Sequence, residues 1–269
     1  MSSKLMALGK AMEAVGDGAL LALGGNTLNR APMAAVYALA GQGKRKLRLV
    51  KTAGAMDVDL LCFAGCVQSV DAGFVSYESQ FSLCPHYRSC VEHGLVKANE
   101  HACYTVISAL RASAYGLPFM PVKGLKESDL RRAHPYFALV KDPFTGEDLA
   151  AVRALRPDWA IIHVQQADAR GNARIDGPVY EDLLMSQAAQ RVLITAEEIV
   201  DDGFFSRCER KAQIPHFLTD AVVYKPQGAS PCSCPNRYPV DESEILSFLA
   251  LADQEALLHW LSESGREQG

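Results

Sequence analysis

The first residues whose types and spacing suggest chemistry form a polar loop behind two glycines. A short apolar run ends at Gly24 and Gly25, and a proline at the start of a helical pattern closes the loop at residue 32. We call residues 24–32 the opening loop. Main chain without a Cβ can approach a ligand closely, and the free amides of a helix N-terminus favour an anionic group. The donor side chains of the loop are Asn26, Thr27, Asn29 and Arg30.

Two interpretations of the opening loop follow from its residues. It is either a backbone-lined pocket at the carboxyl end of a strand or an ordinary strand–turn–helix connection. It is not a dinucleotide-binding loop, because Asn26 and Asn29 occupy the third and sixth positions counted from Gly24, where that motif has glycines.

A second polar segment follows the strand expected at residues 73–77. It contains Ser76, Tyr77, Glu78 and Ser79. Because the carboxyl ends of parallel strands meet at one edge of a sheet, these side chains can reach the same crevice as the opening loop. Exposed polar decoration is the alternative interpretation.

The other polar residues near strand ends favour structural roles. His163 lies within an apolar strand, so it is interpreted as a hydrogen-bonded core histidine, and Asp168 and Asn172 favour a turn. Glu197 and Glu198 follow a core strand, and a buried carboxylate there would need a cationic partner. The candidate partners are Arg30 and Arg191. No Gly-x-Ser-x-Gly sequence occurs, so the residues predict no nucleophile of the triad type.

Eight cysteines are many for this length, but their settings are those of reduced thiols. Cys62 and Cys66 lie one turn apart on an apolar helical pattern, where thiols act as small hydrophobic groups. Cys232 and Cys234 form one tight pair in a loop rich in proline and serine, without the second pair that a zinc site needs. We predict no metal site and no disulfide framework.

Composition indicates an ordinary globular protein. The chain has 269 residues, of which 49% are hydrophobic and 22% charged, and its formal net charge is −4. A negative balance without a long Lys/Arg block argues against a nucleic-acid partner. No apolar run approaches the roughly 20 residues that span a bilayer, and residues 1–6 lack a signal core. We therefore expect a cytoplasmic protein.

Strand and helix patterns alternate through most of the chain. The expected strands are at residues 19–23, 47–50, 73–77, 96–98, 119–122, 159–164, 191–195 and 221–224. The expected helices are at residues 4–15, 32–40, about 57–64, 85–91, 104–115 and 180–190. This alternation predicts an α/β fold with an open, mostly parallel sheet covered by helices on both faces. We expect one domain over residues 1–269, with a β-hairpin insertion at about 137–152 and a C-terminal helix at about 241–262.

Taken in order, several short motifs resemble those of one enzyme family. They are Gly24-Gly25 through Arg30-Ala31-Pro32, Ala64-Gly65-Cys66-Val67, Gly116-Leu117-Pro118-Phe119, Asp142-Pro143-Phe144-Thr145-Gly146, Ala154-Leu155-Arg156-Pro157-Asp158, Asp168-Ala169-Arg170-Gly171-Asn172 and Thr195-Ala196-Glu197-Glu198. The ordered series is similar to the A (alpha) chains of class I coenzyme A-transferases, closest to the glutaconate type, over nearly the whole chain.

The resemblance implies a NagB/RpiA-like sheet and a homologous B subunit in an α2β2 heterotetramer. It implies that the acyl-CoA thioester is attacked by a glutamate of the B subunit, which becomes a glutamyl-CoA thioester. No catalytic residue is then expected on this chain, and no permanently bound cofactor, since coenzyme A thioester is a substrate. The substrate-binding residues expected here are Gly24, Gly25, Asn26, Thr27, Asn29, Arg30, Ser76 and Tyr77.

Departures from the family pattern leave the reaction and its acid open. Asn26 stands where many members have phenylalanine, and with Arg30 in the loop this favours a polar or dicarboxylic acyl group. A ring-opening hydrolase branch keeps a glutamate where this chain has Cys103, with Glu100 nearby, which weighs against that branch. A decarboxylase branch stays open. A ligand-binding sensor is the non-enzymatic alternative, and the absence of a basic helix-turn-helix pattern argues against it.

Overall fold

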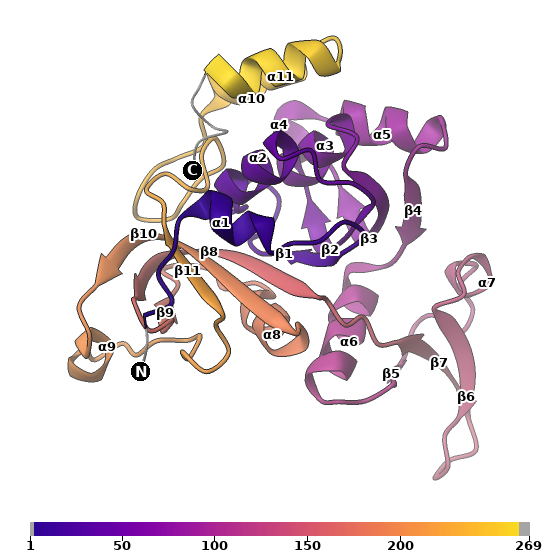
Figure 1. The fold of residues 1–269 in the computed structure, drawn as a ribbon. Helices are drawn as coiled ribbons and strands as arrows, with labels where there is room; N and C mark the ends of the chain where they lie inside the picture. The colour runs from indigo at the N-terminus through magenta and orange to yellow at the C-terminus, as the bar shows by residue number, and fades with distance from the viewer. Residues whose placement is uncertain (1–2, 264–269) are drawn as a thin grey trace.

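Apolar runs that alternate with helical segments form one large sheet in the computed structural model, which describes residues 3–263 (Figure 1). The strand order is β11-β10-β8-β1-β2-β3-β4, and β9 adds to β8. The strands are β1 (Leu20–Leu23), β2 (Leu47–Gly54), β3 (Val67–Val75), β4 (Lys97–Glu100), β8 (Trp159–Asp168), β9 (Ala173–Arg174), β10 (Arg191–Val200) and β11 (Ala221–Tyr224). Every pair along the main order is parallel, and only β8 and β9 pair antiparallel. The expected open and mostly parallel sheet is confirmed.

Strand β8 shows why the sheet needs cover on both faces. All ten of its residues are buried, as expected for an interior strand flanked by parallel neighbours. Its side chains alternate between two cores: Trp159 and Ile161 join one cluster, while Ala160, Ile162 and Val164 join the other.

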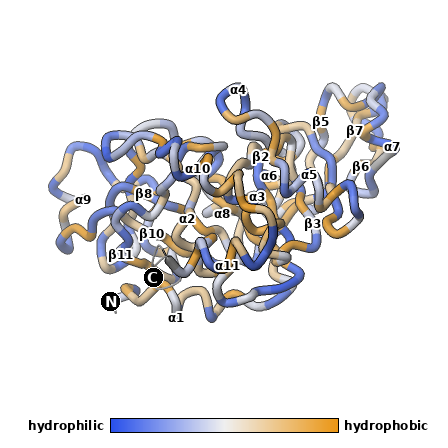
Figure 2. The backbone as a smooth tube through the Cα atoms, turned by 90° about the horizontal axis from the view of Figure 1, so that it is seen from above, coloured by the Kyte–Doolittle hydropathy of each residue, from blue (hydrophilic) through white to orange (hydrophobic). Residues whose placement is uncertain are grey.

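The helices divide between these two cores. The first face carries α1 (Leu8–Glu13), α2 (Met33–Gly41), α3 (Met56–Phe63), α5 (Pro85–Glu92), α10 (Glu242–Leu249) and α11 (Gln254–Glu263). The second face carries α6 (Cys103–Ala114) and α8 (Asp182–Ala188). Short helices lie at the rim: α4 (Glu78–Phe81), α7 (Leu130–Ala133) and α9 (Phe204–Arg207). In Figure 2, α2 and α3 are largely apolar near the middle of the molecule, while the α4 turn at the edge is hydrophilic.

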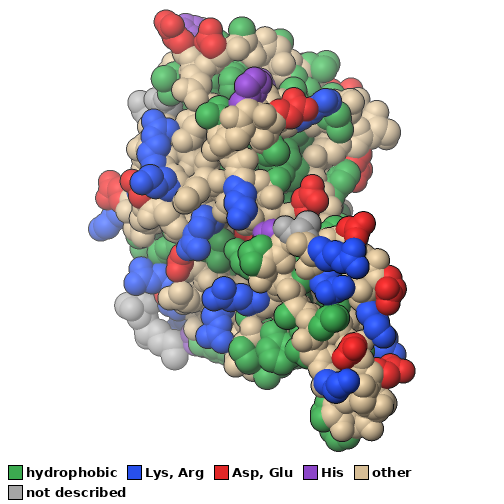
Figure 3. Space-filling model, turned by 90° about the vertical axis from the view of Figure 1, so that its right-hand side faces the viewer, with side chains coloured by type: hydrophobic (Ala, Val, Ile, Leu, Met, Phe, Trp, Pro, Cys, Tyr) green, Lys and Arg blue, Asp and Glu red, His purple; other side chains and the backbone are tan. Residues whose placement is uncertain are grey.

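The insertion forms a small sheet of its own. Strands β5 (Phe119–Val122), β6 (Phe137–Lys141) and β7 (Asp148–Arg153) are antiparallel in the order β5-β7-β6. The hairpin of β6 and β7 matches the expected insertion. Residues 119–122 were expected in the main sheet, and this prediction is wrong: they pair antiparallel with β7 in the small sheet. Figure 3 shows this part as a protrusion on which acidic, basic and apolar side chains are interspersed.

Two other boundaries differ from the sequence prediction. Strand β3 begins at Val67 rather than near residue 73, and most residues of its N-terminal half are buried. The expected single C-terminal helix is two helices, separated between Leu249 and Gln254. The Asp241 side chain caps the first of them by accepting from the Glu244 amide at 3.0 Å.

Within residues 3–263, no helix combines the length and the apolar character that crossing a membrane requires.

Candidate active site

Four segments meet at the carboxyl end of β2. The amide of Thr27, in the opening loop, donates to the Ala53 carbonyl at 3.0 Å, and the Ser76 amide donates to the Gly54 carbonyl at 3.0 Å. The hydroxyl of Thr52 donates to Oε2 of Glu181 at 2.6 Å. The thiol of Cys103, at the start of α6, lies 3.5 Å from the Thr52 carbonyl. We call these four segments, together with residues 52–54, the β2-end site.

The predicted meeting of the opening loop with the segment after β3 is confirmed. Both line one surface pocket of about 250 Å³. Its lining residues are Thr27, Leu28, Asn29, Tyr77, Glu78, Ser79, Gln80, Ser233 and Val240. Asn29 donates weakly to Ser233 Oγ at 3.4 Å, and its buried Oδ1 atom has no hydrogen-bond partner among the described residues.

The glycines of the opening loop are fixed by close packing. A Cβ on Gly24 would lie 2.5 Å from Oδ1 of Asp182, and Gly25 has φ +70° with the Asn29 carbonyl directly against it. The Gly25 amide donates to Asp182 Oδ1 at 2.8 Å. The Asn26 amide donates to the Asn29 carbonyl at 2.9 Å. The amides of Gly25 and Asn26 therefore hold the loop together.

Arg30 requires a correction. Its side chain is fully buried and forms an ion pair with Asp182 at 2.6 Å. It also donates to the carbonyls of His163 at 3.0 Å and Pro178 at 2.7 Å. The sequence placed this guanidinium toward a substrate, but burial forces a long cation to take an internal counter-charge. Arg30 holds the opening loop against α8 and β8, and its side chain does not face the pocket.

Tyr77 and Ser76 are also turned inward. Tyr77 is 1% exposed, and its hydroxyl donates to Asp59 Oδ2 at 3.2 Å. Ser76 Oγ accepts from the Glu78 amide at 3.0 Å and donates to the Ser82 carbonyl at 2.8 Å. Both side chains therefore stabilise the turn that contains Glu78. This geometry argues against direct contact between either side chain and a substrate.

Sequence reasoning missed Glu181 and Thr52. Neither belongs to a motif, and 129 residues separate them in the chain. Thr52 sits on a strand that ends at the site, and Glu181 immediately precedes α8. The only available signal was that Thr52 lies near the carboxyl end of a parallel strand, where α/β proteins bind ligands.

Backbone strain is concentrated in the β2-end site. Four of its non-glycine residues have positive φ: Thr27 at 43°, Arg30 at 53°, Glu78 at 61° and Tyr180 at 49°. Such conformations cost about 1–3 kcal/mol each and persist where the surroundings dictate them, often at functional sites. The Tyr180 ring stands 5.9 Å from the Arg30 guanidinium carbon and covers the buried ion pair.

A second buried ion pair supports the loop from the β2 side. Lys51 and Asp57 are fully buried and lie 2.5 Å apart. Lys51 also donates to the Gly24 carbonyl at 2.7 Å. Asp57 lies in the first turn of α3, and its Oδ1 accepts from the amides of Ala55 and Val58.

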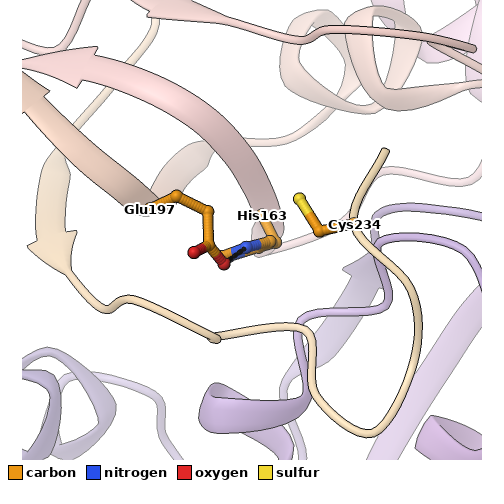
Figure 4. A group of neighbouring side chains, drawn as sticks. All are labelled: His163, Glu197 and Cys234. Atoms are coloured by element: carbon orange, nitrogen blue, oxygen red, sulfur yellow. Dashed lines mark hydrogen bonds and ion pairs between the residues drawn. The ribbon is translucent and has the colours of Figure 1, made fainter. Parts of the chain in front are cut away.

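His163 lies in a separate buried network, as the sequence predicted for a structural histidine (Figure 4). Its ring nitrogens lie 2.9 Å from Thr195 Oγ1 and 2.7 Å from Glu197 Oε1. Burial lowers the pKa of His163, and the hydrogen bond and charge of Glu197 oppose that effect. Because a carboxylate can only accept, Nε2 donates a proton to Glu197.

Glu197 is the inward carboxylate that the sequence anticipated, but its partners are not arginines. Burial raises its pKa, and hydrogen bonds from His163 and Tyr238 outweigh that effect, so the net pKa is lowered. Tyr238 donates at 2.6 Å. Glu198 is half-buried instead and pairs with Arg237 at 2.8 Å.

The same network is the one group of the described residues whose atoms could hold a metal. The donor atoms of His163, Glu197 and Cys234 all lie within 4.8 Å of one another. The carboxylate oxygen nearest His163 already accepts from that ring, from Tyr238 and from the Gly228 amide. Burial raises the pKa of Cys234 to about 12. A metal would need a deprotonated thiol and free lone pairs on the carboxylate, and this network offers neither. We therefore interpret it as a structural hydrogen-bond network that joins β8, β10 and residues 228–239.

Fold and site together define an α/β protein with a surface pocket where the opening loop meets the segment after β3. The family model for coenzyme A transferase matches residues 5–225. This chain belongs to the coenzyme A transferase family. The predicted resemblance to the A (alpha) chains of such enzymes is confirmed.

Curated relatives extend over nearly the whole chain. It is 33% identical to the A (alpha) chain of 3-oxoadipate CoA-transferase of Pseudomonas knackmussii, over 97% of this chain and 93% of that protein. It is 35% identical to an uncharacterized protein of Archaeoglobus fulgidus over 95% of this chain, and it spans 57% of that longer protein.

Two solved structures share its fold closely. Glutaconate coenzyme A-transferase of Acidaminococcus fermentans matches with a TM-score of 0.90 and 31% identity, over 97% of this chain and 88% of the other. The decarboxylase AibA/AibB matches with a TM-score of 0.88 and 35% identity, over 98% of this chain and 99% of the other.

Proposed function

We propose that this chain is the A (alpha) component of a two-component CoA-transferase that moves CoA between an acyl-CoA and a short carboxylic, dicarboxylic or oxo acid. The observation that carries the proposal is the β2-end site, where the opening loop and the segment after β3 line one pocket in a chain of the transferase fold. Coenzyme A thioester enters as substrate, and the proposal needs no permanently bound cofactor.

The covalent steps belong to the partner in this proposal. The thioester carbonyl is attacked by a glutamate of the homologous B subunit, which forms an anhydride with the acyl group and releases CoA as its thiolate. The thiolate then attacks the glutamyl carbonyl, releases the donor acid as a carboxylate and leaves a glutamyl-CoA thioester. The acceptor carboxylate repeats these two steps in reverse, so that CoA passes to the acceptor acid and the glutamate is freed. Such a relay divides one difficult step into easier ones. This chain supplies one wall of the pocket, where Thr27 and Asn29 orient the acid against the partner's glutamate.

The loop glycines act through the backbone in this account. Gly24 and Gly25 allow the loop to fold tightly over β8 and α8, and Asn26 lies half-buried at its bend. The side chains of Arg30, Ser76 and Tyr77 hold this geometry without touching the acid.

An α2β2 assembly and a cytoplasmic location are part of the same proposal. Relatives named as the A component of CoA-transferases support a B partner. All eight cysteines are free, and five of them are buried, which suits a reducing compartment.

A decarboxylase is the second candidate, because the decarboxylase AibA/AibB is as similar in fold and 35% identical. A hydrolase of the ring-opening kind has less support: the first residue of α6 is Cys103, whose thiol cannot replace a carboxylate as general base at neutral pH without an activating partner.

Co-expression with the B subunit encoded beside it tests these alternatives. Addition of acyl-CoA followed by borohydride reduction would mark a glutamate of the B subunit that has become a thioester, and mass spectrometry would locate it. Transfer of CoA to an added acid supports the transferase. Release of CO₂ without a marked glutamate identifies the decarboxylase, and loss of CoA without an acceptor identifies the hydrolase. Absence of any marked glutamate and of any transfer contradicts the proposal.

A further inference from the structure

The small sheet is attached to the main body of the molecule by side-chain packing. Among the described residues, no hydrogen bond or ion pair joins residues 123–153 to residues 3–115. Apolar side chains of the small sheet, such as Phe137 and Val152, share a core with Val106 and Leu110 of α6. An attachment of this kind can open locally while the rest of the fold stays intact.

Two histidines occupy the contact between the start of β6 and the edge of the main sheet. His101, just after β4, is 5% exposed, and His134, shortly before β6, is 7% exposed. Their ring centroids lie 5.7 Å apart. His134 also packs edge-on against Tyr136 with 4.2 Å between ring centroids, and His101 packs edge-on against Phe137 at 5.4 Å. The two sheets therefore meet through aromatic rings of which two are titratable imidazoles.

A backbone hydrogen bond fixes the proton of His134. Its Nδ1 accepts from the Tyr136 amide at 3.2 Å, so the neutral ring holds its proton on Nε2. That Nε2 is buried and has no hydrogen-bond partner among residues 3–263. A second proton would have to bind at Nδ1, where it would face the N–H of Tyr136. Protonation of His134 therefore breaks the hydrogen bond that fixes the chain just before β6.

The surroundings of His134 offer no free carboxylate for an imidazolium. The titratable and charged groups that face its ring are His101, Asp71 of β3, Lys97 of β4 and Tyr136. Both oxygens of Asp71 are engaged, because Oδ1 lies 3.3 Å from His101 Nε2 and Oδ2 accepts from Asn99 Nδ2 at 3.1 Å. A charged ring would thus be a buried cation without an acceptor, which is costly.

The electrostatics agree with this geometry. Burial lowers the pKa of His134, and the charge of His101 lowers it further, while Asp71 acts in the opposite direction. The arginines of the preceding α7 are bound elsewhere: Arg131 donates to the Lys126 carbonyl, and Arg132 pairs with Asp129.

We propose that His134 is a pH-sensitive switch that holds the small sheet against the edge of the main sheet when neutral and releases it when protonated. A released His134 has the ordinary pKa of 6.5, whereas the packed ring has a lower pKa. The attachment is therefore complete above pH 6.5 and weakens as the pH falls below that value.

Release would change a depression beside the β2-end site. Leu130, the first residue of α7, and His101 line a depression of about 270 Å³ that Gly73 also lines. A Cβ on Gly73 would lie 2.3 Å from the Cys103 amide nitrogen, so the depression borders the β2-end site at the start of α6. Loosening of residues 134–137 frees α7, which directly precedes them, and widens this depression.

Hydrogen–deuterium exchange of the full chain at pH 8 and pH 5 tests the switch. Labelling times are scaled for the pH dependence of chemical exchange, and peptides are analysed by mass spectrometry. Protection of residues 134–141 should fall by at least about tenfold at pH 5, since each pH unit of differential titration is worth a factor of about ten. Residues 159–168 of β8 should keep their protection.

Three variants separate the switch from general acid loosening. His134→Asn keeps an acceptor for the amide two residues on, as in an Asx turn, and cannot be protonated in this range, so residues 134–141 should stay protected at pH 5. His134→Phe keeps an aromatic ring without the acceptor and should lower the protection at both pH values. His93→Asn, at an exposed position, should keep the wild-type response.

A measurement on wild type alone covers the case in which the variants fold poorly. Nitrogen-15 NMR of labelled histidine at pH 8 should show His134 with a protonated Nε2 and an unprotonated Nδ1. A proton on Nδ1 at pH 8, equal protection of residues 134–141 at both pH values, equal losses in β8, or an unchanged pH response in His134→Asn would overturn the proposal. The experiment needs neither substrate nor B subunit, so its outcome is independent of the proposed function.

Discussion

The Arg30 guanidinium lies 2.6 Å from the Asp182 carboxylate, and both side chains are fully buried. Asp182 also accepts from the Gly25 amide, and Arg30 donates to the His163 carbonyl. The pair therefore ties the opening loop to α8 and to β8. The sequence predicted that Arg30 would bind the substrate, but the structure shows that Arg30 stabilises the opening loop.

Removing one member of this pair should destabilise the protein strongly. Arg30→Met leaves the Asp182 charge buried without its cation, which costs about 3–5 kcal/mol. Urea unfolding followed by fluorescence should show the loss. Arg88→Met is the matched control, because the Arg88–Glu92 pair is more than half exposed and such pairs contribute about 0–1 kcal/mol. Equal stability of the two variants would show that the buried pair does not form.

Gly25→Ala should destabilise the protein by more than the left-handed backbone conformation of Gly25 alone would explain. Gly25 has φ +70°, and a Cβ would overlap the Asn29 carbonyl and the Arg30 backbone. Gly43 has a similar φ of +63° but no atom within 4 Å of its added Cβ. Gly43→Ala therefore measures the left-handed conformation alone, about 1–2 kcal/mol.

The excess loss in Gly25→Ala reports the close packing of the opening loop. We expect it to appear both in the midpoint of urea unfolding and as loss of acid binding by the complex with the B subunit. A Gly25→Ala protein that matches Gly43→Ala in stability and still binds acid would show that the loop can open without consequence.

Sequence patterns were sufficient for the sheet but not for its edges. Apolar runs such as residues 159–164 and 191–195 identified interior strands, because a strand buried on both faces has no other composition. The short strand at residues 119–122 carries the same apolar signal, and only its antiparallel partner β7 shows that it belongs to the small sheet.

The candidate site was predicted in position and only partly in its side chains. Glycines and strand ends located the opening loop, since those signals are local. Whether Arg30 faces solvent or Asp182 depends on a residue 152 positions away, and the Thr52–Glu181 contact spans 129 positions. Periodicity and composition contain no information on such pairings, so these roles required the fold.

Asp59 should make the protein less stable as pH rises. Burial raises its pKa from 3.8 to about 7, although the Tyr87 amide at 2.7 Å and the Tyr77 hydroxyl act to lower it. Folded protein therefore holds this proton up to about pH 7, while the unfolded chain releases it near pH 4. The stabilising contribution is complete below pH 4 and is lost as pH rises toward and through 7.

Urea unfolding at pH 5 and pH 8 checks this expectation. Asp59→Asn keeps the shape but cannot ionise, so wild type should lose on the order of 2–3 kcal/mol relative to Asp59→Asn between these values. Burial lowers the pKa of His163, so its protonation destabilises the fold as pH falls, which is the opposite trend. This effect is the same in wild type and in Asp59→Asn, and it cancels when the two proteins are compared. Parallel pH profiles of the two proteins would contradict the assignment.

Cys103 should be the thiol that reports on the β2-end site. It is the exposed cysteine of the chain, at the first residue of α6, whereas Cys90 and Cys208 are half-buried and the other five are buried. Brief treatment of the isolated chain with iodoacetamide should therefore modify Cys103 first, as peptide mass spectrometry would show.

Modification of Cys103 should then lower the activity of the assembled complex, because its thiol lies 3.5 Å from the carbonyl of Thr52 in the β2-end site. Prior addition of acyl-CoA should slow the labelling of Cys103 in the complex. Cys103→Ser should keep the activity and lose its sensitivity to the reagent. Full activity after stoichiometric labelling of Cys103 would place the substrate away from this end of β2, and the crevice would then have to be sought on another edge of the sheet.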